Sequence, residues 1–469
     1  MKNTELSELD KSYHKKIWPI YLLNGFNGIA FGGLIILIVP LSSLFWPGED
    51  YHAFEMGLLV TTLLWVSSIT GIIFGWLIDR YSRVNILLII SIMRGFSMFM
   101  LGFATVGKGF LTWLYFFVFV FTFAVFAGGS YPSMVSLSND IVPLNQRSKF
   151  FGLLSIFGSI FMMMGFLISG FLVQFGYWRV YFGFIGVAIF FTGFLFYIYV
   201  EEPKRGIQNK ELREVLEDEA IKYDFKMNKK MMRKTMLSKT NLTALIEGIF
   251  TNVFMGSLDM IILPYLQTPP HNISPLVTAL FILIFGVIGR IIGQIILARI
   301  SDKVAQKNHI RRIYFIIISL IGGSATFFLM FFIPLPIFSL EEGASILLFF
   351  TFPATFALGL LLLTGDAVSS LYAVNQPPIL QEINLPEAQG QITSWNQFLE
   401  HIGYGMGPLI AGIAISFFGQ NYQISATIII LFNIPGIILW FLATNWYPGD
   451  KKEISEILKE RSLILNSRR

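Results

Sequence analysis

The residues able to do chemistry are charged side chains set inside long apolar runs. In the second half of the chain these are Glu247, Asp259, Arg290, Asp366, Glu400 and His401, whereas Arg94 is the one interior ionisable residue in the runs of the first half. The acids outnumber Arg290, so at least one carboxyl should hold a proton or contact water. This pattern predicts proton exchange at a carboxyl, with Glu400 as first candidate and Glu247 and Asp366 behind it. A fixed ion pair between Arg290 and one acid is the structural alternative.

The composition places these apolar runs in a membrane. Of the 469 residues, 54% are hydrophobic and 13% are charged, whereas a soluble domain has about 25% charged residues. Runs of about 18 or more residues with few charges are long enough to cross a bilayer as helices. We expect twelve such helices, at 17–45, 55–79, 84–106, 110–138, 150–175, 178–200, 238–266, 275–300, 311–335, 344–374, 392–418 and 422–446. The predicted fold class is therefore all-α and integral to the membrane.

The sequence also argues against several functions. With no Cys, the chain has no disulfide, no thiolate metal site and no thiol nucleophile. It has no phosphate-binding Gly-Lys-Ser/Thr loop, so we expect no direct coupling to ATP. The first apolar run is too long for a cleavable signal peptide, and the net charge of +5 reflects basic loops rather than nucleic-acid binding. We expect no enzyme activity, no cofactor, no bound metal and no nucleic-acid partner.

Basic residues gather in the loops on one side of the predicted membrane domain. They follow the second and eighth runs (Arg80, Arg83, Lys303, Lys307), whereas the opposite loops are acidic (Glu49, Asp50, Glu341, Glu342). By the positive-inside rule, the basic loops and both termini lie in the cytoplasm. We therefore expect a multi-pass protein of the cell membrane with cytoplasmic termini.

The runs fall into two similar halves. A charged segment after the sixth run divides the chain into an N-terminal six-helix bundle at 1–205, a cytoplasmic linker at 206–236 and a C-terminal six-helix bundle at 237–469. Pro143-Leu144-Asn145-Gln146 before the fifth run recurs as Pro386-Glu387-Ala388-Gln389 before the eleventh. Such a repeat is usual in transporters that hold their site between two bundles.

The loop after the second run combines a glycine, an acid and two arginines, as Gly75-x-x-x-Asp79-Arg80-x-x-Arg83, and a weaker copy after the eighth run ends in Asp302-Lys303. With the six-plus-six layout, Trp178-Arg179 opening the sixth run and Glu202-Pro203-Lys204-Arg205-Gly206 closing it, the loop resembles the signature of the major facilitator superfamily. The resemblance covers essentially the whole chain. It implies that this loop pairs its charges with neighbouring helix ends when the carrier faces outward, and we expect Asp140 to be the partner of Arg80 or Arg83.

A fainter similarity links the chain to the Spinster-like lipid and lysolipid carriers. It lies in Leu22-Leu23-Asn24 of the first run and in the segment from Pro386 to Pro408. The chain differs from those carriers in the first and fourth runs, where Asn27 and Gly129-Ser130-Tyr131 stand in place of their acids.

Depth along the helices groups the interior charges. At about 1.5 Å per residue, Glu247, Arg290, Asp366 and Glu400 lie about 12 to 18 Å from the cytoplasmic ends of their runs, so we expect them in one layer. The superfamily resemblance implies that the seventh, eighth, tenth and eleventh helices face a central cavity, where these four groups would converge. Asp259 lies about 18 Å beyond Glu247 and is expected nearer the outer mouth. Asn396 precedes Glu400 by one turn on a small, polar stripe, and His401 points away from it.

The first half offers neutral candidates for contact with cargo. These are Asn24 and Asn27 on the first run and Tyr131 on the fourth. Packing or hydrogen bonding within the bundle is the alternative role for each of them. Arg94 lies on the third run, which is peripheral in the superfamily, so we expect it to be bonded locally.

Together these features predict a secondary active transporter of a small organic or amphipathic solute. It would work by alternating access, coupled to protons or another cation through the C-terminal carboxylates, as a monomer in the lipid bilayer. An uncoupled facilitator and a scramblase-like lipid or lysolipid transporter are alternatives. A non-transporting membrane receptor is a further alternative, although the polar tails, about 16 and 23 residues long, are short for that role.

Overall fold

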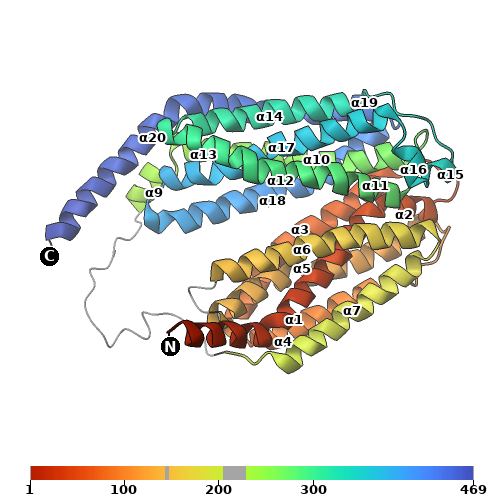
Figure 1. The fold of residues 1–469 in the computed structure, drawn as a ribbon, viewed down its shortest axis with the longest axis horizontal. Coiled ribbons are helices and arrows are strands. Elements are labelled where there is room, and N and C mark those ends of the chain that lie inside the picture. The colour runs from red at the N-terminus through yellow and green to blue at the C-terminus, as the bar shows by residue number, and fades with distance from the viewer. Residues whose placement is uncertain (1, 143–146, 204–228, 468–469) are drawn as a thin grey trace. The chain divides into compact units, whose positions relative to one another are not determined.

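A computed structural model of the chain describes residues 2–142, 147–203 and 229–467 (Figure 1). All regular structure within these ranges is helical, and twelve of the helices are long and apolar enough to cross a membrane. The predicted all-α fold with twelve membrane spans is therefore confirmed. Most of the predicted linker, at residues 204–228, and the first copy of the repeated tetrapeptide, at 143–146, lie outside the described residues.

The chain divides into two compact units, one made of Met1–Asp218 with Ile273–Ala279 and the other of Glu219–Asn272 with Leu280–Arg469. The first six spans comprise α1 (Lys2–Ile36), α2 (Ile38–Phe45), α3 (Ala53–Arg80), α4 (Arg83–Leu101), α5 (Phe110–Ile141), α6 (Arg147–Gln174) and α7 (Trp178–Tyr199). Among them α1 packs against α6, α3 against α5, and α4 against both α5 and α7.

The later helices repeat this pairing. They are α9 (Lys229–Thr235), α10 (Lys239–Gln267), α11 (Pro275–Phe281), η2 (Ile282–Val287), α12 (Ile288–Ile292), η3 (Gly293–Leu297), α13 (Ala298–Lys307), α14 (Arg311–Met330), α15 (Leu340–Gly343), α16 (Ile346–Phe349), α17 (Pro353–Glu382), α18 (Pro386–Phe417), α19 (Tyr422–Leu431) and α20 (Ile434–Ser467). Here α10 packs against α18, α12 against α17, and α14 against both α17 and α20. In each half the first span therefore pairs with the fifth, and the second and third pair with the fourth.

Glycines allow the closest of these contacts. A Cβ atom at Gly32 of α1 would lie 2.4 Å from the carbonyl oxygen of Met162 on α6, and one at Gly403 of α18 would lie 2.4 Å from that of Ile249 on α10. Helix backbones that approach so closely exclude larger residues. The small, polar stripe predicted on the eleventh span is therefore, at Gly403, a packing seam against the seventh.

Several span boundaries differ from the prediction. The first run breaks at Leu37 between α1 and α2, and the last helix continues to Ser467. The tenth span begins at Pro353 and ends at Glu382, instead of covering 344–374. The apolar residues between 344 and 352 form only the short helix α16 with turns on either side, and Pro353 occupies the first turn of α17, where its missing N–H is tolerated. The helix then continues through Pro377 and Pro378.

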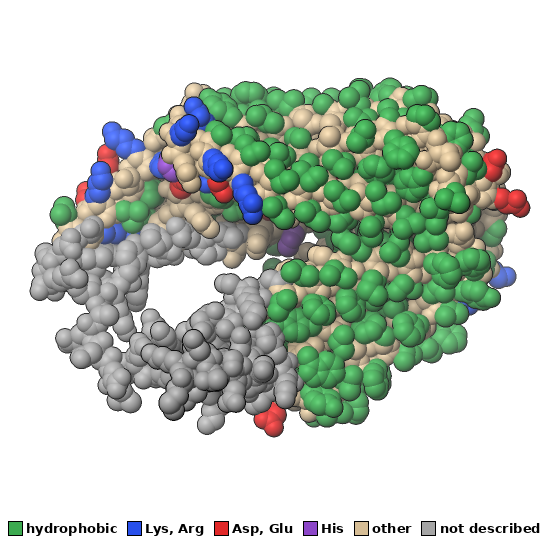
Figure 2. Space-filling model, in the orientation of Figure 1, with side chains coloured by type: hydrophobic (Ala, Val, Ile, Leu, Met, Phe, Trp, Pro, Cys, Tyr) green, Lys and Arg blue, Asp and Glu red, His purple; other side chains and the backbone are tan. Residues whose placement is uncertain are grey.

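The outer surface suits a bilayer. Hydrophobic side chains cover most of the helices on the face drawn in Figure 2. In the second unit, exposed cations follow the eighth span at Lys303, Lys307 and Arg311, whereas exposed acids stand at the opposite end of the helices, at Glu341 and Glu342. This distribution leaves an apolar band between two charged ends, as expected for membrane spans.

Candidate functional site

The first cluster of charged side chains in the second unit surrounds Arg290 on α12. Its Nε donates a hydrogen bond to Oδ1 of Asp366 on α17 at 3.0 Å, and its Nη2 lies 3.8 Å from Oδ1 of Asp259 on α10. The Tyr404 hydroxyl of α18 donates to Oδ2 of Asp259 at 2.7 Å. The side chains of Arg290 and Asp259 are 53% and 48% exposed, whereas that of Asp366 is 11% exposed. Two carboxylates thus share one cation, and part of this cluster is open.

The eighth span is distorted on both sides of Arg290. The π-helical segments η2 and η3 flank the five-residue α12. Segments of π-helix within α-helices are frequent at functional sites because they change the direction of side chains. Gly289 also lets this span approach α17, since a Cβ atom there would lie 2.4 Å from the carbonyl oxygen of Leu363. Backbone distortion and close packing together bring the guanidinium to Asp366.

The second cluster joins two carboxyls through a tyrosine. Glu247 on α10 is completely buried, and its Oε2 lies 3.1 Å from the hydroxyl of Tyr372 on α17. The same hydroxyl lies 3.3 Å from Oε1 of Glu400 on α18. The Thr251 hydroxyl donates to Oε1 of Glu247. No ion pair among the described residues includes either glutamate.

Amide side chains orient the second cluster. Nε2 of Gln376 donates to the Tyr372 hydroxyl at 2.8 Å, and Nδ2 of Asn396 donates to Oε1 of Glu400 at 2.9 Å. Gln376 and Asn396 also bond to each other at 3.2 and 3.3 Å. These contacts hold Tyr372 and Glu400 at fixed positions on facing helices.

The four charged residues that we expected in one layer lie in two separate clusters. Glu247 and Glu400 meet at Tyr372, whereas Arg290 and Asp366 join Asp259, the residue that we expected farther toward the outer mouth. The error comes from the tenth span. Because α17 ends at Glu382, Asp366 lies sixteen residues, about 24 Å, from the C-terminal end of that helix instead of about 12 Å.

The other interior charges stand apart from both clusters. His401 is exposed. In the first unit, Arg94 is buried, with Nη1 donating to the hydroxyl of Ser130 at 2.8 Å and Cζ lying 4.4 Å from the ring centre of Phe123. Arg94 is thus bonded locally, as its place on the third span suggests.

The neutral candidates of the first unit have three different environments. Nδ2 of Asn24 donates to the carbonyl oxygen of Leu154 on α6 at 2.9 Å, which ties α1 to α6. Oδ1 of Asn27 is buried without a hydrogen-bond partner, and Tyr131 is 61% exposed. Tyr131 and Asn27 therefore keep hydrogen-bonding capacity that Asn24 uses within the bundle.

The charged loop after the second span is organised by Glu202, a partner that we did not expect. Arg83 is 2% exposed, and its Nε donates to Oε1 of Glu202 at 2.7 Å. Oε2 of Glu202 accepts from the Val84 N–H at 2.9 Å and from the Ser82 hydroxyl at 2.8 Å, so the carboxylate also caps the N-terminus of α4. Burial opposes ionisation of Glu202, but these hydrogen bonds and the Arg83 charge hold its pKa below the ordinary value.

The remaining members of this loop differ in their surroundings. The guanidinium carbon of Arg80 lies 3.9 Å from the ring centre of Trp76, a cation–π contact. A Cβ atom at Gly75 would meet nothing within 4 Å. The side chains of Asp79 and Asp140 lie outside the described part of the structure, so the pairing expected for Asp140 stays a prediction.

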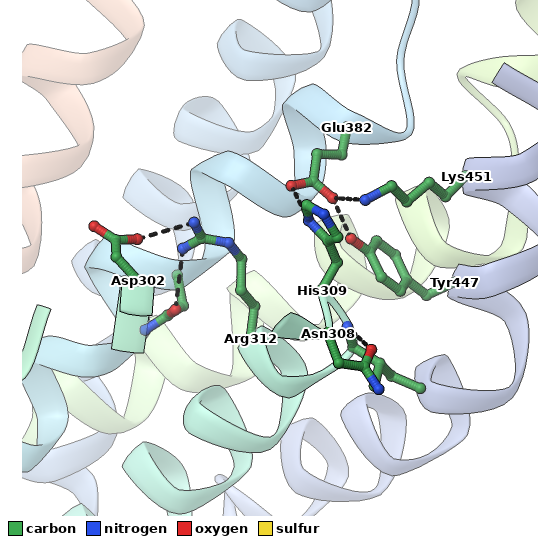
Figure 3. A network of polar contacts seen from close by, with 9 residues as sticks. Asp302, Asn308, His309, Arg312, Glu382, Tyr447 and Lys451 are labelled. Atoms are coloured by element: carbon green, nitrogen blue, oxygen red, sulfur yellow. Dashed lines mark hydrogen bonds and ion pairs between the residues drawn. The ribbon is translucent and has the colours of Figure 1, made fainter. Parts of the chain in front are cut away.

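The weaker copy of the loop forms its own polar network in the second unit (Figure 3). Oδ1 of Asp302 pairs with Nη2 of Arg312 at 2.9 Å, while Lys303 is exposed. Beside them, Glu382 at the end of α17 accepts from Lys451 of α20 at 2.7 Å, contacts His309 at 2.9 Å and also accepts from Tyr447. Figure 3 shows these side chains converging on Glu382 from two other segments.

The sequence contains a pattern that indicates a role for Tyr372, but the predicted end of the tenth span obscures this pattern. Tyr372 and Gln376 are one helical turn apart, which is the spacing of a polar helix face. Ending the span at residue 374 puts Gln376 in a loop, whereas in α17 it is buried and bonded to Tyr372. The described residues contain no group of three or more His, Asp or Glu side chains that could hold a metal ion.

Twelve spans in two units with matching helix pairings are the architecture of a polytopic membrane carrier. The family model for the Major Facilitator Superfamily matches residues 17–376. The chain belongs to this superfamily, as its sequence resemblance indicates, and is a multi-pass integral membrane protein. No curated protein sequence matches it.

Solved transporter structures share the fold. A bacterial homologue of the human lysosomal transporter Spinster, in an inward-facing and unoccupied conformation, matches with a TM-score of 0.70 and 16% identity over 93% of this chain and 98% of that chain. The inward-facing and occupied form matches with a TM-score of 0.68 and 15% identity over 92% and 97%. A D-xylose-proton symporter matches with a TM-score of 0.59 and 16% identity over 89% and 96%. At these identities the likeness establishes the fold alone.

Proposed function

We propose that the protein is a secondary active transporter that moves a small organic or amphipathic solute by alternating access, coupled to protons through carboxyls of the second unit. The proposal of proton coupling rests on Glu247, because this residue is completely buried in a membrane span and pairs with no cation among the described residues. An ionised side chain in such a place costs about 2.5–3.5 kcal/mol on insertion scales. Binding a proton removes this cost, so Glu247 is suited to change its protonation during a transport cycle.

The Arg290 cluster is the proposed contact for solute. Its exposed guanidinium and the Asp259 carboxylate present both signs of charge to the same open region, while Asp366 fixes the guanidinium. Asn27 and Tyr131 are the neutral groups proposed to contact solute from the first unit, with Asn24 as a third candidate. A polar centre with few charges fits an amphipathic solute better than a polyanion, which would need several cations.

The Gly75 to Arg83 loop is proposed to bias the conformational equilibrium rather than to recognise solute. The buried Arg83 and the partly exposed Glu202 form an ion pair at the N-terminus of α4, which is well suited to hold one arrangement of these helix ends. Asp302 with Arg312 would act in the same way in the second unit. We further propose two six-helix bundles at 1–205 and 237–469, cytoplasmic termini, location in the cell membrane and a monomeric carrier.

Reconstituted vesicles test the coupling directly. A radiolabelled panel of amphipathic amines, sugars, nucleosides and lysolipids identifies a transported solute, whose accumulation is then measured with and without a pH gradient. Glu247→Gln and Glu400→Gln should abolish accumulation against the solute gradient and spare solute exchange at equal pH. Glu341→Gln, at an exposed position on the short helix α15, is the matched control. Gradient-driven accumulation that survives both substitutions would refute the proposal, and flux that ignores the pH gradient in the unmodified protein would indicate a facilitator or scramblase.

A further inference from the structure

The Tyr372 hydroxyl has three polar neighbours and a limited capacity to bond them. A tyrosine hydroxyl donates one hydrogen bond and accepts two. Gln376 fills one acceptor position, because its Nε2 donates at 2.8 Å. The two other neighbours are carboxyl oxygens, Oε2 of Glu247 at 3.1 Å and Oε1 of Glu400 at 3.3 Å.

The single hydroxyl proton cannot be donated to both carboxyls. If it goes to Glu247, the oxygen of Glu400 faces the remaining lone pair of Tyr372, and this contact is favourable only when Glu400 carries a proton to donate. The reverse assignment requires the proton on Glu247. All three contacts are satisfied when one of the two glutamates is protonated and the other is ionised. If both were ionised, two acceptors would compete for one donor.

Among the described residues, no other charged side chain contacts this cluster. The titratable groups are Glu247 of α10, Tyr372 of α17 and Glu400 of α18. The other described groups close to it are neutral, namely Thr251, Gln376, Asn396, Asn433 and Trp440. Arg290 bonds to acids that lie farther along the helices. Because the described residues around Glu247 and Glu400 supply no cation, a proton is the positive charge that balances this pair.

From this count we propose that Tyr372 is a proton bridge between Glu400 and Glu247, and that the pair holds one exchangeable proton. The inference rests on the proposed proton coupling and adds its path and its stoichiometry. The O–H bond of the Glu400 carboxyl breaks as its proton bonds to the Tyr372 oxygen, while the former Tyr372 proton bonds to the Glu247 carboxylate. Tyr372 ends unchanged, Glu400 becomes ionised and Glu247 becomes neutral, so charge and atoms balance.

Burial gives the two ends of the bridge different roles. Glu247 is completely buried, whereas Glu400 is partly exposed. Glu400 therefore exchanges its proton with water, and Glu247 receives it only through Tyr372. Asn396 holds Glu400 toward the bridge by donating to Oε1 at 2.9 Å. One proton is then taken up or released by the pair in each transport cycle.

Infrared spectroscopy after a pH jump tests this bridge without any solute. The purified full chain in lipid nanodiscs is shifted in pH, and the carbonyl stretch of protonated carboxyls is followed in time, with Glu247→Gln and Glu400→Gln assigning the signals. In Tyr372→Phe the Glu247 signal should change about 100-fold more slowly, the size of effect that a positioned proton-transfer group provides. The Glu400 signal should keep its rate. Tyr314→Phe, an exposed tyrosine on α14, is the matched control.

Two outcomes would overturn the proposal. One is a Glu247 signal that changes as fast in Tyr372→Phe as in the unmodified protein. The other is that Glu247 and Glu400 together hold two protons, or none, at neutral pH. If Tyr372→Phe does not fold, Gln376→Leu tests the number of protons that the two glutamates hold. This change frees a lone pair on the Tyr372 oxygen and should allow both carboxyls to be protonated together. An unchanged proton count in Gln376→Leu would then refute the bridge. Since no transport is measured, the bridge can fail while the coupling test with Glu247→Gln and Glu400→Gln still succeeds.

Discussion

Arg290 neutralises only part of the negative charge around it. Asp366 bonds to Nε at 3.0 Å, and Asp259 lies 3.8 Å from Nη2. If the cation is removed, two carboxylates remain near each other in a membrane span. If Asp366 is neutralised instead, one cation and one acid remain. The two substitutions therefore have unequal physical consequences.

Arg290→Gln should lower stability more than Asp366→Asn, and the double substitution should recover part of the loss. We expect the single Arg290 change to cost about 1–3 kcal/mol, the range for leaving a charged partner unsatisfied. Thermal unfolding of the four proteins in one detergent gives the coupling energy, expected at about 0.5–3 kcal/mol for residues in contact. Purely additive effects would show that the pair at 3.0 Å contributes nothing to folding.

Glu202 makes stability depend on pH at the N-terminal end of α4. Because its pKa is held below the ordinary value, its contribution is complete above about pH 4.3 and is lost as the pH falls through the lowered pKa. Glu202→Gln should destabilise the protein by about 1–2 kcal/mol near neutral pH, a charged hydrogen bond discounted for partial exposure. Unfolding temperatures between pH 3 and 7 provide the measurement. The difference between the two proteins should narrow toward pH 3, and a constant difference would contradict the assigned role.

At the scale of the helix, the position of Arg290 depends on how closely the eighth span approaches α17. Even the small Cβ atom of Gly289→Ala would lie 2.4 Å from the Leu363 carbonyl oxygen, and backbone cannot move aside as a flexible side chain can. The helices must separate, which we expect to cost about 1–3 kcal/mol, as overpacking does. Arg290 should then lose its bond to Asp366.

Unfolding temperature and solute flux measure this effect together. Gly183→Ala on α7 is the control, because a Cβ atom there meets nothing within 4 Å. That change should be neutral or stabilising by up to about 1 kcal/mol, since alanine favours helix over glycine. Equal effects of the two substitutions would mean that close packing of the eighth span is not what places Arg290.

Hydropathy is sufficient to predict the number of spans, because lipid leaves the backbone few options other than helix. It is insufficient for their ends. The residues between 344 and 352 are mostly apolar, as in a span, yet they form only the short helix α16 and turns, and this shift moves Asp366 away from Glu247. The meeting of Glu247, Tyr372 and Glu400 also depends on the rotation of three helices about their axes. The depth of a residue along its own helix gives no information on that rotation.

At the scale of the whole molecule, the two halves share a fold but differ in the clusters of charged side chains that they contain. Both halves pair their spans in the same way, yet the carboxyl cluster and the Arg290 cluster lie in the second unit. The first unit has a buried Arg94 bonded to a serine, and a partly buried ion pair between Arg83 and Glu202 at a helix end. We infer that the second unit handles protons and that the first contributes conformational control and neutral contacts.

Under the proposed proton coupling, the direction in which a proton gradient would drive transport depends on the orientation of the chain in the membrane. Because the chain has no Cys, single cysteines report accessibility without background. Glu341→Cys at α15 and Lys307→Cys at the end of α13 are exposed positions at opposite ends of the helices. With cytoplasmic termini, a membrane-impermeant maleimide should label Glu341→Cys on intact cells, and Lys307→Cys only in inside-out vesicles. The reverse pattern would invert the topology and place the Arg83 and Glu202 pair outside the cell, so the sign of the gradient in every flux experiment would have to be exchanged.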